Sequence, residues 1–163
     1  MTFSDCTVLV AEDDPDAVFL LRRAFQKANL QNPIAVAHDG QEAIDYLSRQ
    51  GAYADPERYR LPVLMLLDLK MPRKTGFEVL EWLRQQPGLK RLIVVVLTTS
   101  NQLADINRAY DLGSNSYLVK PATFDALVQM VNSISNYWLE LNQRPDLPNK
   151  TPTDVTVPHR AAA

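Results

Sequence analysis

Short apolar runs alternate along the chain with longer segments in which apolar residues recur every three or four positions. Apolar runs of strand length that alternate with helical patterns indicate βα units around a parallel sheet. The pattern therefore predicts an α/β fold built from five such units, a (βα)5 arrangement. The expected strands lie at residues 7–11, 34–37, 63–68, 92–98 and 116–120.

The expected helices carry recognisable end signals. Asp14 is a suitable N-cap for the first helix, and Pro15 suits its first position. Gly113 is placed to close the fourth helix. The later helices are expected to begin near residues 40 and 75, to span 103–112, and to run from 123 to about 141.

Two stretches do not fit a minimal version of this pattern. Residues 50–61 form a polar loop that is longer than most connections of this kind. Beyond residue 141 the chain becomes rich in proline. We expect one domain over residues 5–142, followed by a disordered or extended tail over residues 143–163. The four prolines of that tail are Pro145, Pro148, Pro152 and Pro158.

Composition narrows the possible partners and the compartment. The 163 residues suit one domain with a sizeable core, and the formal charge is −2 with acids and bases mixed. This balance gives no general attraction to nucleic acid or to an anionic membrane. The single Cys6 cannot form an internal disulfide, and the apolar runs are too short for a membrane span. We expect a soluble cytoplasmic protein without nucleic-acid or membrane partners.

Polar side chains with distinct chemistry stand where the predicted strands end. Glu12 and Asp13 follow the first strand, Asp68 ends the third, Thr98 ends the fourth and Lys120 ends the fifth. In an open parallel sheet, ligands bind at the carboxyl ends of the strands. Carboxylates that crowd together repel each other unless a cation neutralises them, and Mg²⁺ prefers such oxygen ligands. The acids therefore predict a Mg²⁺ site.

The same residues fit phosphoryl transfer to a carboxylate. A carboxylate can act as the nucleophile and form an aspartyl phosphate. Mg²⁺ and Lys120 would balance the negative charge of the transferring group, and the Thr98 hydroxyl would donate to one oxygen. Each residue alone is most simply a solvated loop residue, an N-cap or a strand end. Together, and in this order, they predict self-phosphorylation on Asp68.

Four motifs carry a resemblance to a known family. They are VLVAEDDP at residues 8–15, LLDLKMPRKTG at 66–76, VVLTT at 95–99 and GSNSYLVKP at 113–121. Over about residues 5–142 the sequence resembles the receiver domain of two-component response regulators. The resemblance implies a flavodoxin-like, doubly wound sheet of five parallel strands in the order 2-1-3-4-5.

The resemblance also implies roles at the site. Asp68 would accept phosphate from a histidine kinase. Asp13, Asp68 and the backbone carbonyl of Lys70 would bind Mg²⁺, and Glu12 would hold a water bound to the metal. Glu12 stands where most receivers have aspartate, and Lys70 stands where asparagine is frequent.

A second group of implied roles concerns the conformational switch. Thr98 and Lys120 would bind the phosphoryl group, and Tyr117 would rotate inward as Thr98 moves. The Lys120–Pro121 peptide would be cis, an isomer that proline permits at small energetic cost.

Further features resemble the small cyanobacterial response regulators that serve phytochrome-linked histidine kinases. They are the tyrosines of the 50–61 loop, the Thr98-Thr99-Ser100 run and the Tyr137-Trp138-Leu139 segment. In that subfamily the receiver is the whole protein and tends to form dimers, so we expect no output domain. The fifth helix has more apolar residues than one core stripe can bury. The predicted dimer surface comprises Tyr110, Met130, Tyr137, Trp138 and Leu139, although isolated exposed apolar residues are also ordinary.

Two other functions compete with a phosphoacceptor switch. A turnover phosphatase or phosphotransferase commonly needs a second acid two residues after the nucleophile, where this chain has Lys70. A pseudo-receiver would keep the fold as a binding module without the chemistry, but Asp13, Asp68, Thr98 and Lys120 are all present. We therefore expect self-phosphorylation and autodephosphorylation rather than enzymatic turnover.

Overall fold

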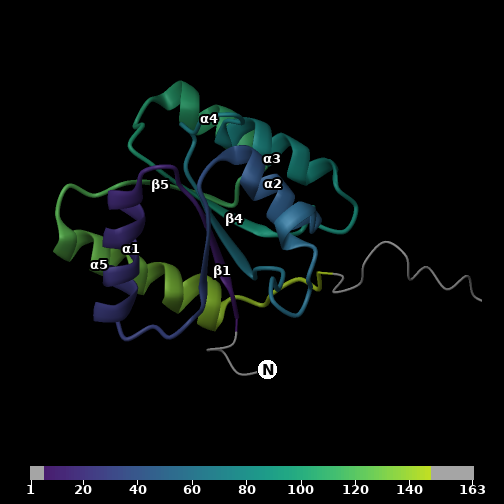
Figure 1. The fold of residues 1–163 in the computed structure, drawn as a ribbon. Coiled ribbons are helices and arrows are strands. Elements are labelled where there is room, and N and C mark those ends of the chain that lie inside the picture. Colours follow the sequence, from purple (N-terminus) through teal and green to yellow (C-terminus); the bar gives the residue numbers. More distant parts are fainter. Residues whose placement is uncertain (1–5, 148–163) are drawn as a thin grey trace, which may run out of the picture.

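The computed structural model describes residues 6–147 and contains a parallel sheet of five strands (Figure 1). The strand order is β2-β1-β3-β4-β5, which confirms the predicted α/β fold and its topology. Each observed strand lies within its predicted range. The bounds are Val8–Ala11 for β1, Ile34–Ala37 for β2, Leu64–Leu67 for β3, Ile93–Thr98 for β4 and Ser116–Val119 for β5.

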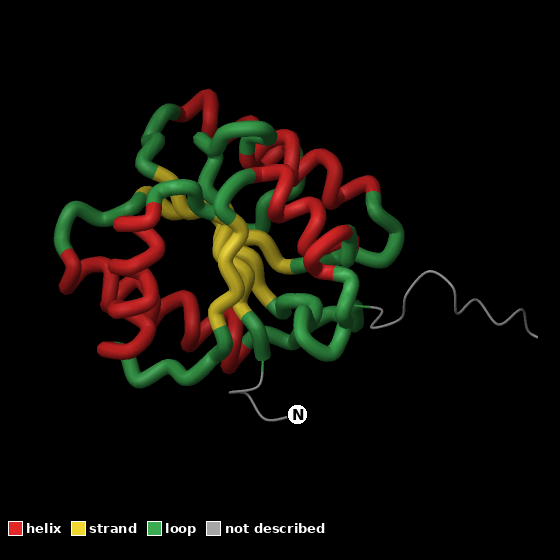
Figure 2. Tube along the Cα trace, viewed as in Figure 1, coloured by secondary structure: helices red, strands yellow, loops and turns green. Residues whose placement is uncertain are grey.

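Helices cover both faces of the sheet (Figure 2). Alternate strand residues face opposite sides, so Leu66 packs with α1 and α5, whereas Leu67 packs with α2 and α3. α4 packs over a smaller cluster around Val96 and Ala109. The helices are α1 (Pro15–Lys27), α2 (Gly40–Ser48), α3 (Gly76–Gln85), α4 (Leu103–Asp111) and α5 (Phe124–Ile134).

Side-chain caps fix the helix N-termini beside the strand ends. Asp14 accepts a hydrogen bond from the backbone N–H of Asp16 and, as predicted, precedes Pro15 at the start of α1. Thr75 and Glu78 form a reciprocal capping box at the start of α3. These caps anchor the loops that carry the acids.

Two glycines allow backbone segments to touch at the same edge. A Cβ atom on Gly76 would lie 2.2 Å from the backbone oxygen of Asp68, and one on Gly40 would lie 2.0 Å from the backbone oxygen of Lys74. Since real Cβ atoms do not approach so closely, any larger residue would displace the loop. The segment 68–76 is thus held between the first turns of α2 and α3.

The C-terminal end of the fifth helix differs from the prediction. After Ile134 the chain continues as a π-helical segment, Ser135–Leu141, in which the N–H of Asn142 bonds to the carbonyl of Tyr137 at 2.7 Å. The buried residues Val131, Ser135 and Leu139 nevertheless keep a spacing of four through this segment. Leu139 is buried in the α1/α5 core, so the prediction that it lies off the core face is wrong.

The described chain extends past the predicted domain boundary at residue 142. Leu147 packs against the core on the α2/α3 side, and the Arg144 guanidinium lies 2.6 Å from the sulfur of Cys6. These contacts place residues 144–147 on the body of the domain. Residues 148–163, the larger part of the predicted tail, lie outside the described residues. Within residues 6–147, no helix has the length and apolar character needed to cross a bilayer.

The long loop after α2 is organised by tyrosines. The rings of Tyr46, Tyr53 and Tyr59 lie 5.0–6.0 Å apart between centroids in tilted or edge-on arrangements. The Tyr53 hydroxyl donates to Glu42, and the Tyr46 hydroxyl donates to the carbonyl of Arg60 at 2.9 Å. The predicted polar loop is therefore anchored on α2 by aromatic contacts.

Candidate functional site

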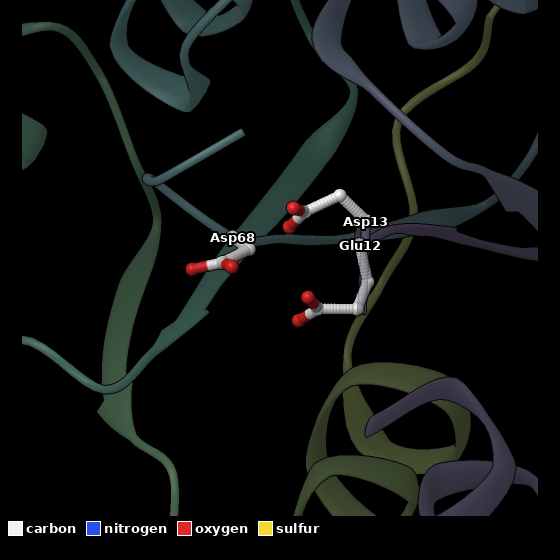
Figure 3. A group of neighbouring side chains, drawn as sticks. All are labelled: Glu12, Asp13 and Asp68. Atoms are coloured by element: carbon white, nitrogen blue, oxygen red, sulfur yellow. The ribbon is translucent and has the colours of Figure 1, made fainter. Parts of the chain in front are cut away.

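Three carboxylates meet at the carboxyl edge of the sheet. Glu12 and Asp13 follow β1, and Asp68 follows the adjacent β3. Figure 3 shows the side chains of Glu12 and Asp13 extending toward that of Asp68, and the three can each offer an oxygen within 4.8 Å of the others. Glu12 and Asp68 are buried, whereas Asp13 is exposed. This is the cluster that the strand ends predicted.

Lys120 reaches into the acidic cluster from the end of β5. Its ammonium donates a hydrogen bond to Glu12 and lies 3.6 Å from Oδ2 of Asp68. The other oxygen of Asp68 accepts from the N–H of Leu69 at 2.8 Å. One ammonium thus faces three carboxylates, which leaves the site with an excess of negative charge.

The surroundings of Glu12 make that excess costly. Val10, Leu66 and Leu97 help to line an apolar cavity of about 110 Å³ that Glu12, Asp68 and Lys120 border. Burial raises the pKa of Glu12 above its usual value, and the charge of Asp68 adds to the effect. The hydrogen bonds from Lys120 and Asp14 oppose the rise in pKa. A further cation would relieve this repulsion.

Thr98 places a hydroxyl at the end of β4, next to Asp68 on the sheet edge. The residue is fully buried, and its Oγ1 has no hydrogen-bond partner among the described residues. Its backbone oxygen accepts from the N–H of Lys120 at 2.8 Å, which joins the ends of β4 and β5. A buried hydroxyl is stabilised when a partner satisfies it, so Thr98 is suited to bind a ligand oxygen.

Comparison with known proteins identifies a family whose model covers all the residues of this site. The family model of the response regulator receiver domain matches residues 8–132. The chain belongs to the response regulator receiver family. The match spans all five strands and every predicted residue of the acidic, hydroxyl and ammonium groups.

Relatives of the receiver include regulators connected with phytochromes. Response regulator Rcp1 of Synechocystis is 38% identical over 133 residues, which cover 82% of this chain and 88% of Rcp1. The structure of the phosphorylated cyanobacterial phytochrome response regulator RcpA is 36% identical, with a TM-score of 0.80 over 87% of this chain and 99% of RcpA. RPA3017, a response regulator in red light signaling of R. palustris, is 35% identical with a TM-score of 0.83, covering 86% and 99%. The predicted resemblance to phytochrome-associated regulators is confirmed.

Tyr117 lies on the inner side of the receiver's α4–β5 region. Its ring packs against the cluster of Leu69, Val96 and Ala109, and its hydroxyl donates to the carbonyl of Ser100 at 2.9 Å. Burial raises the pKa of the Tyr117 phenol above its usual value. The predicted inward rotation as Thr98 moves stays a prediction.

Lys70 is exposed in the loop after Asp68. The loop is closed at its base by a 2.9 Å hydrogen bond from the N–H of Gly76 to the carbonyl of Leu69. Near its far end, Arg73 adopts the left-handed conformation at φ 63° and donates to Asp39 at 3.1 Å. The sequence did not suggest this link to α2, since an arginine in an αL turn has no simple sequence signal.

The predicted cis peptide is not found. Residues 6–147 contain no cis peptide bond, so the Lys120–Pro121 peptide is trans and the prediction is wrong. The trans form is the lower-energy isomer even before proline. Lys120 reaches Glu12 and Asp68 from this trans arrangement.

The predicted dimer residues do not form one uniform surface. Tyr110 and Tyr137 are exposed, Met130 and Trp138 are half-buried against the α1/α5 core, and Leu139 is buried. Sequence reasoning missed further exposed apolar side chains. They are Phe19 and Leu20 on α1, Leu103 on α4, Val119 on β5 and Leu141 after α5.

Proposed function

We propose that this receiver accepts a phosphoryl group on Asp68 from a histidine kinase and thereby changes its conformation and interactions. The observation that carries the proposal is the convergence of a buried carboxylate, the Lys120 ammonium and the buried Thr98 hydroxyl at one sheet edge. These are the nucleophile and the two groups that stabilise its product. The receiver-domain family model, which matches residues 8–132, supports the same assignment.

The transfer assigns a role to each side chain. An Asp68 oxygen attacks phosphorus, the bond from phosphorus to the donor nitrogen breaks, and the donor imidazole keeps the electron pair. Lys120 turns from Glu12 toward the phosphoryl oxygens, and Thr98 donates its hydroxyl to one of them. The product is a mixed anhydride that water can hydrolyse, so the receiver holds the phosphoryl group without turning over a substrate.

Mg²⁺ fits the donor set of the site. Asp13, Asp68 and the backbone carbonyl of Lys70 would hold the ion, and Glu12 would contribute through water. Three acids opposite one ammonium give the charge excess that a divalent cation requires. The cation would supply charge neutralisation. A solved structure of Rcp1, 36% identical with a TM-score of 0.77 over 86% of this chain and 99% of that one, is described as an Mn²⁺-bound form.

The proposed donor is a cytoplasmic histidine kinase of phytochrome type. RcpA is named as a phytochrome response regulator, and RPA3017 is placed in red light signaling. On this receiver, α1 exposes Phe19 and Leu20, and Leu20 also lines the cavity that Glu12, Asp68 and Lys120 border. An approaching kinase would find an apolar contact surface next to the phosphoacceptor.

We also propose that the receiver forms a homodimer through α4, β5, α5 and the π-helical segment that follows α5. Tyr110 and Tyr137 are the exposed members of the predicted surface, and the Tyr137 ring stacks edge-on against Trp138. Aromatic residues are enriched in interface cores. Light scattering should give a dimer for the wild type and a monomer for a Tyr110→Asp, Tyr137→Asp variant. A wild type that stays monomeric at high micromolar concentration, with and without a phosphoryl analogue, contradicts the proposal.

Incubation with acetyl phosphate and Mg²⁺, followed by intact-mass measurement, tests the phosphoacceptor function. One added phosphoryl group is expected on the wild type and none on Asp68→Asn. No added mass on the wild type would indicate a pseudo-receiver, and release of phosphate over many turnovers would indicate an enzyme. Phosphotransfer assays with candidate phytochrome kinases then test the donor.

A further inference from the structure

The hydroxyl and the carbonyl of Ser100 are both hydrogen-bonded. It lies two residues beyond Thr98, between β4 and α4, and is buried with 6% exposure. Its carbonyl accepts the hydroxyl of Tyr117 at 2.9 Å, and its own hydroxyl donates to Oδ2 of Asp105 at 2.5 Å. A residue of α4 and a residue of β5 therefore meet through Ser100.

This network adjoins the phosphoacceptor site. The Tyr117 ring packs against Leu69, the residue directly after Asp68, and against Val96, which precedes Thr98 by two positions on β4. In this inward position the Tyr117 hydroxyl donates its hydrogen bond to the carbonyl of Ser100. The Ser100 carbonyl keeps its place only while the rest of Ser100 is fixed. Asp105 fixes Ser100 by accepting a charge-assisted hydrogen bond from the Ser100 hydroxyl.

We propose that Asp105 is a positioning residue for the phosphorylation switch. By holding Ser100, Asp105 stabilises the inward position of Tyr117 and so favours the conformation that binds the phosphoryl group. The inference rests on the proposed function and on the predicted inward rotation of Tyr117, through which the phosphoryl group would bind better when Tyr117 is inward. Linkage then requires that weakening the inward position lowers the affinity for a phosphoryl group by a matching factor.

A purely structural role for Asp105 makes a different prediction. Asp105 is the acid in the first turn of α4, where a negative charge stabilises a helix. Loss of that effect would lower thermal stability but would leave Tyr117 and ligand affinity unchanged. Asp125 is a matched control, because it is the exposed first-turn acid of α5 and pairs with Lys27 at 3.6 Å.

The experiment compares wild type, Asp105→Ala, Asp105→Asn, Ser100→Ala, the Asp105→Ala, Ser100→Ala double variant and Asp125→Ala. One readout is the Kd for beryllofluoride, a phosphoryl analogue, at saturating Mg²⁺. The other is the ¹⁹F spectrum of fluorotyrosine-labelled receiver, with the Tyr117 signal identified in Tyr117→Phe. We expect Asp105→Ala to weaken beryllofluoride binding about tenfold and to shift the Tyr117 signal, within the usual range of coupling between sites.

The remaining variants separate the possible causes. Asp105→Asn should recover most of the affinity, because its amide oxygen can still accept from Ser100. The double variant should bind no more weakly than Ser100→Ala, since Asp105 acts through Ser100. Asp125→Ala should match the wild type in both readouts.

Two results would overturn the inference. One is an Asp105→Ala variant with wild-type affinity and an unchanged Tyr117 signal, whatever its thermal stability. The other is a double variant in which the two losses are fully additive. A wild type that fails to bind beryllofluoride contradicts the proposed function instead, and the ¹⁹F comparison without ligand would still decide whether Asp105 positions Tyr117.

Discussion

The centre of the sheet, here called the rigid side, and its β5 edge, here called the looser side, are packed to very different degrees. All residues of β1 and β3 are buried, and α3 buries four of its residues. By contrast, β5 is half-buried to exposed, and Ala109 is the buried residue of α4. The acids follow the tightly packed strands, whereas Tyr117 and the Ser100 network belong to the looser side. Regions with few buried contacts open at low free energy, so the rigid side suits chemistry and the looser side suits switching.

The largest effect should come from the rigid side. Asp68→Asn should abolish phosphorylation because it removes the nucleophile. It should leave the fold intact, and thermal stability without Mg²⁺ should hold or rise since carboxylate repulsion is relieved. Intact-mass and thermal-unfolding measurements check both parts, with the exposed Asp111→Asn on α4 as control. Phosphorylation of Asp68→Asn at the wild-type rate would show that the assigned nucleophile is wrong.

Lys120 follows β5 on the looser side and contacts Glu12 and Asp68 on the rigid side, so its removal tests the contact between the two sides. Lys120→Ala should slow phosphorylation about a hundredfold, the order expected when one preorganised charge-stabilising group is lost. With saturating Mg²⁺ folding should change less than the rate, because the cation replaces the charge that Lys120 places beside Glu12 and Asp68. Phosphorylation rates and thermal unfolding, with the exposed Lys90→Ala as control, measure the two effects. Equal rates for Lys120→Ala and wild type would exclude the lysine from the mechanism.

A pair of truncations compares the packing of the two sides directly. Leu66→Ala on β3 should lower the free energy of unfolding by about 2–5 kcal/mol, since the side chain is 1% exposed. Val119→Ala on β5, at 40% exposure, should change it by about 0.5 kcal/mol or less. Denaturant unfolding measures both. Similar losses at the two positions would contradict the proposed difference in rigidity.

The smallest effect concerns the lifetime of the phosphorylated state. The exposed Lys70 lies two residues beyond Asp68, and Ser100 lies two residues beyond Thr98. The resemblance to receivers implies that these two positions flank the path of an attacking water. Lys70→Ala should speed phosphate loss about two- to fivefold, as expected from one solvent-screened charge. Lys74→Ala in the same loop is the control. A Lys70 variant that loses phosphate no faster than wild type would refute the role.

The sequence predicted those parts of the receiver that depend on local pattern. Strand ranges, the Asp14 cap and the convergence of Glu12, Asp68 and Lys120 follow from apolar runs and from parallel topology. The π-helical segment could not be predicted, because α and π turns share the same residue preferences and tertiary packing decides between them. Leu139 is a different case, because it lies four residues after the buried Ser135 and eight after the buried Val131, a spacing that helical periodicity already places on the core face.

Side-chain networks were equally hidden from sequence. Ser100 and Asp105 look like ordinary loop and first-turn residues, and only the fold brings Tyr117 to the Ser100 carbonyl. The same holds for Asp39 and Arg73, which lie 34 positions apart. Such pairs depend on the spacing of elements that are distant along the chain.

The glycine contacts at the sheet edge have a consequence for how such a receiver can diverge. Gly40 and Gly76 fix the 68–76 loop from the side of α2 and α3, whereas Phe19 and Leu20 lie on α1 across the sheet. Substitutions at Phe19, which is exposed and does not line the cavity of the site, can therefore alter the proposed kinase contact while the reacting groups keep their places. After gene duplication, a copy of this receiver could acquire a new kinase through surface changes alone, without an intermediate that has lost its chemistry.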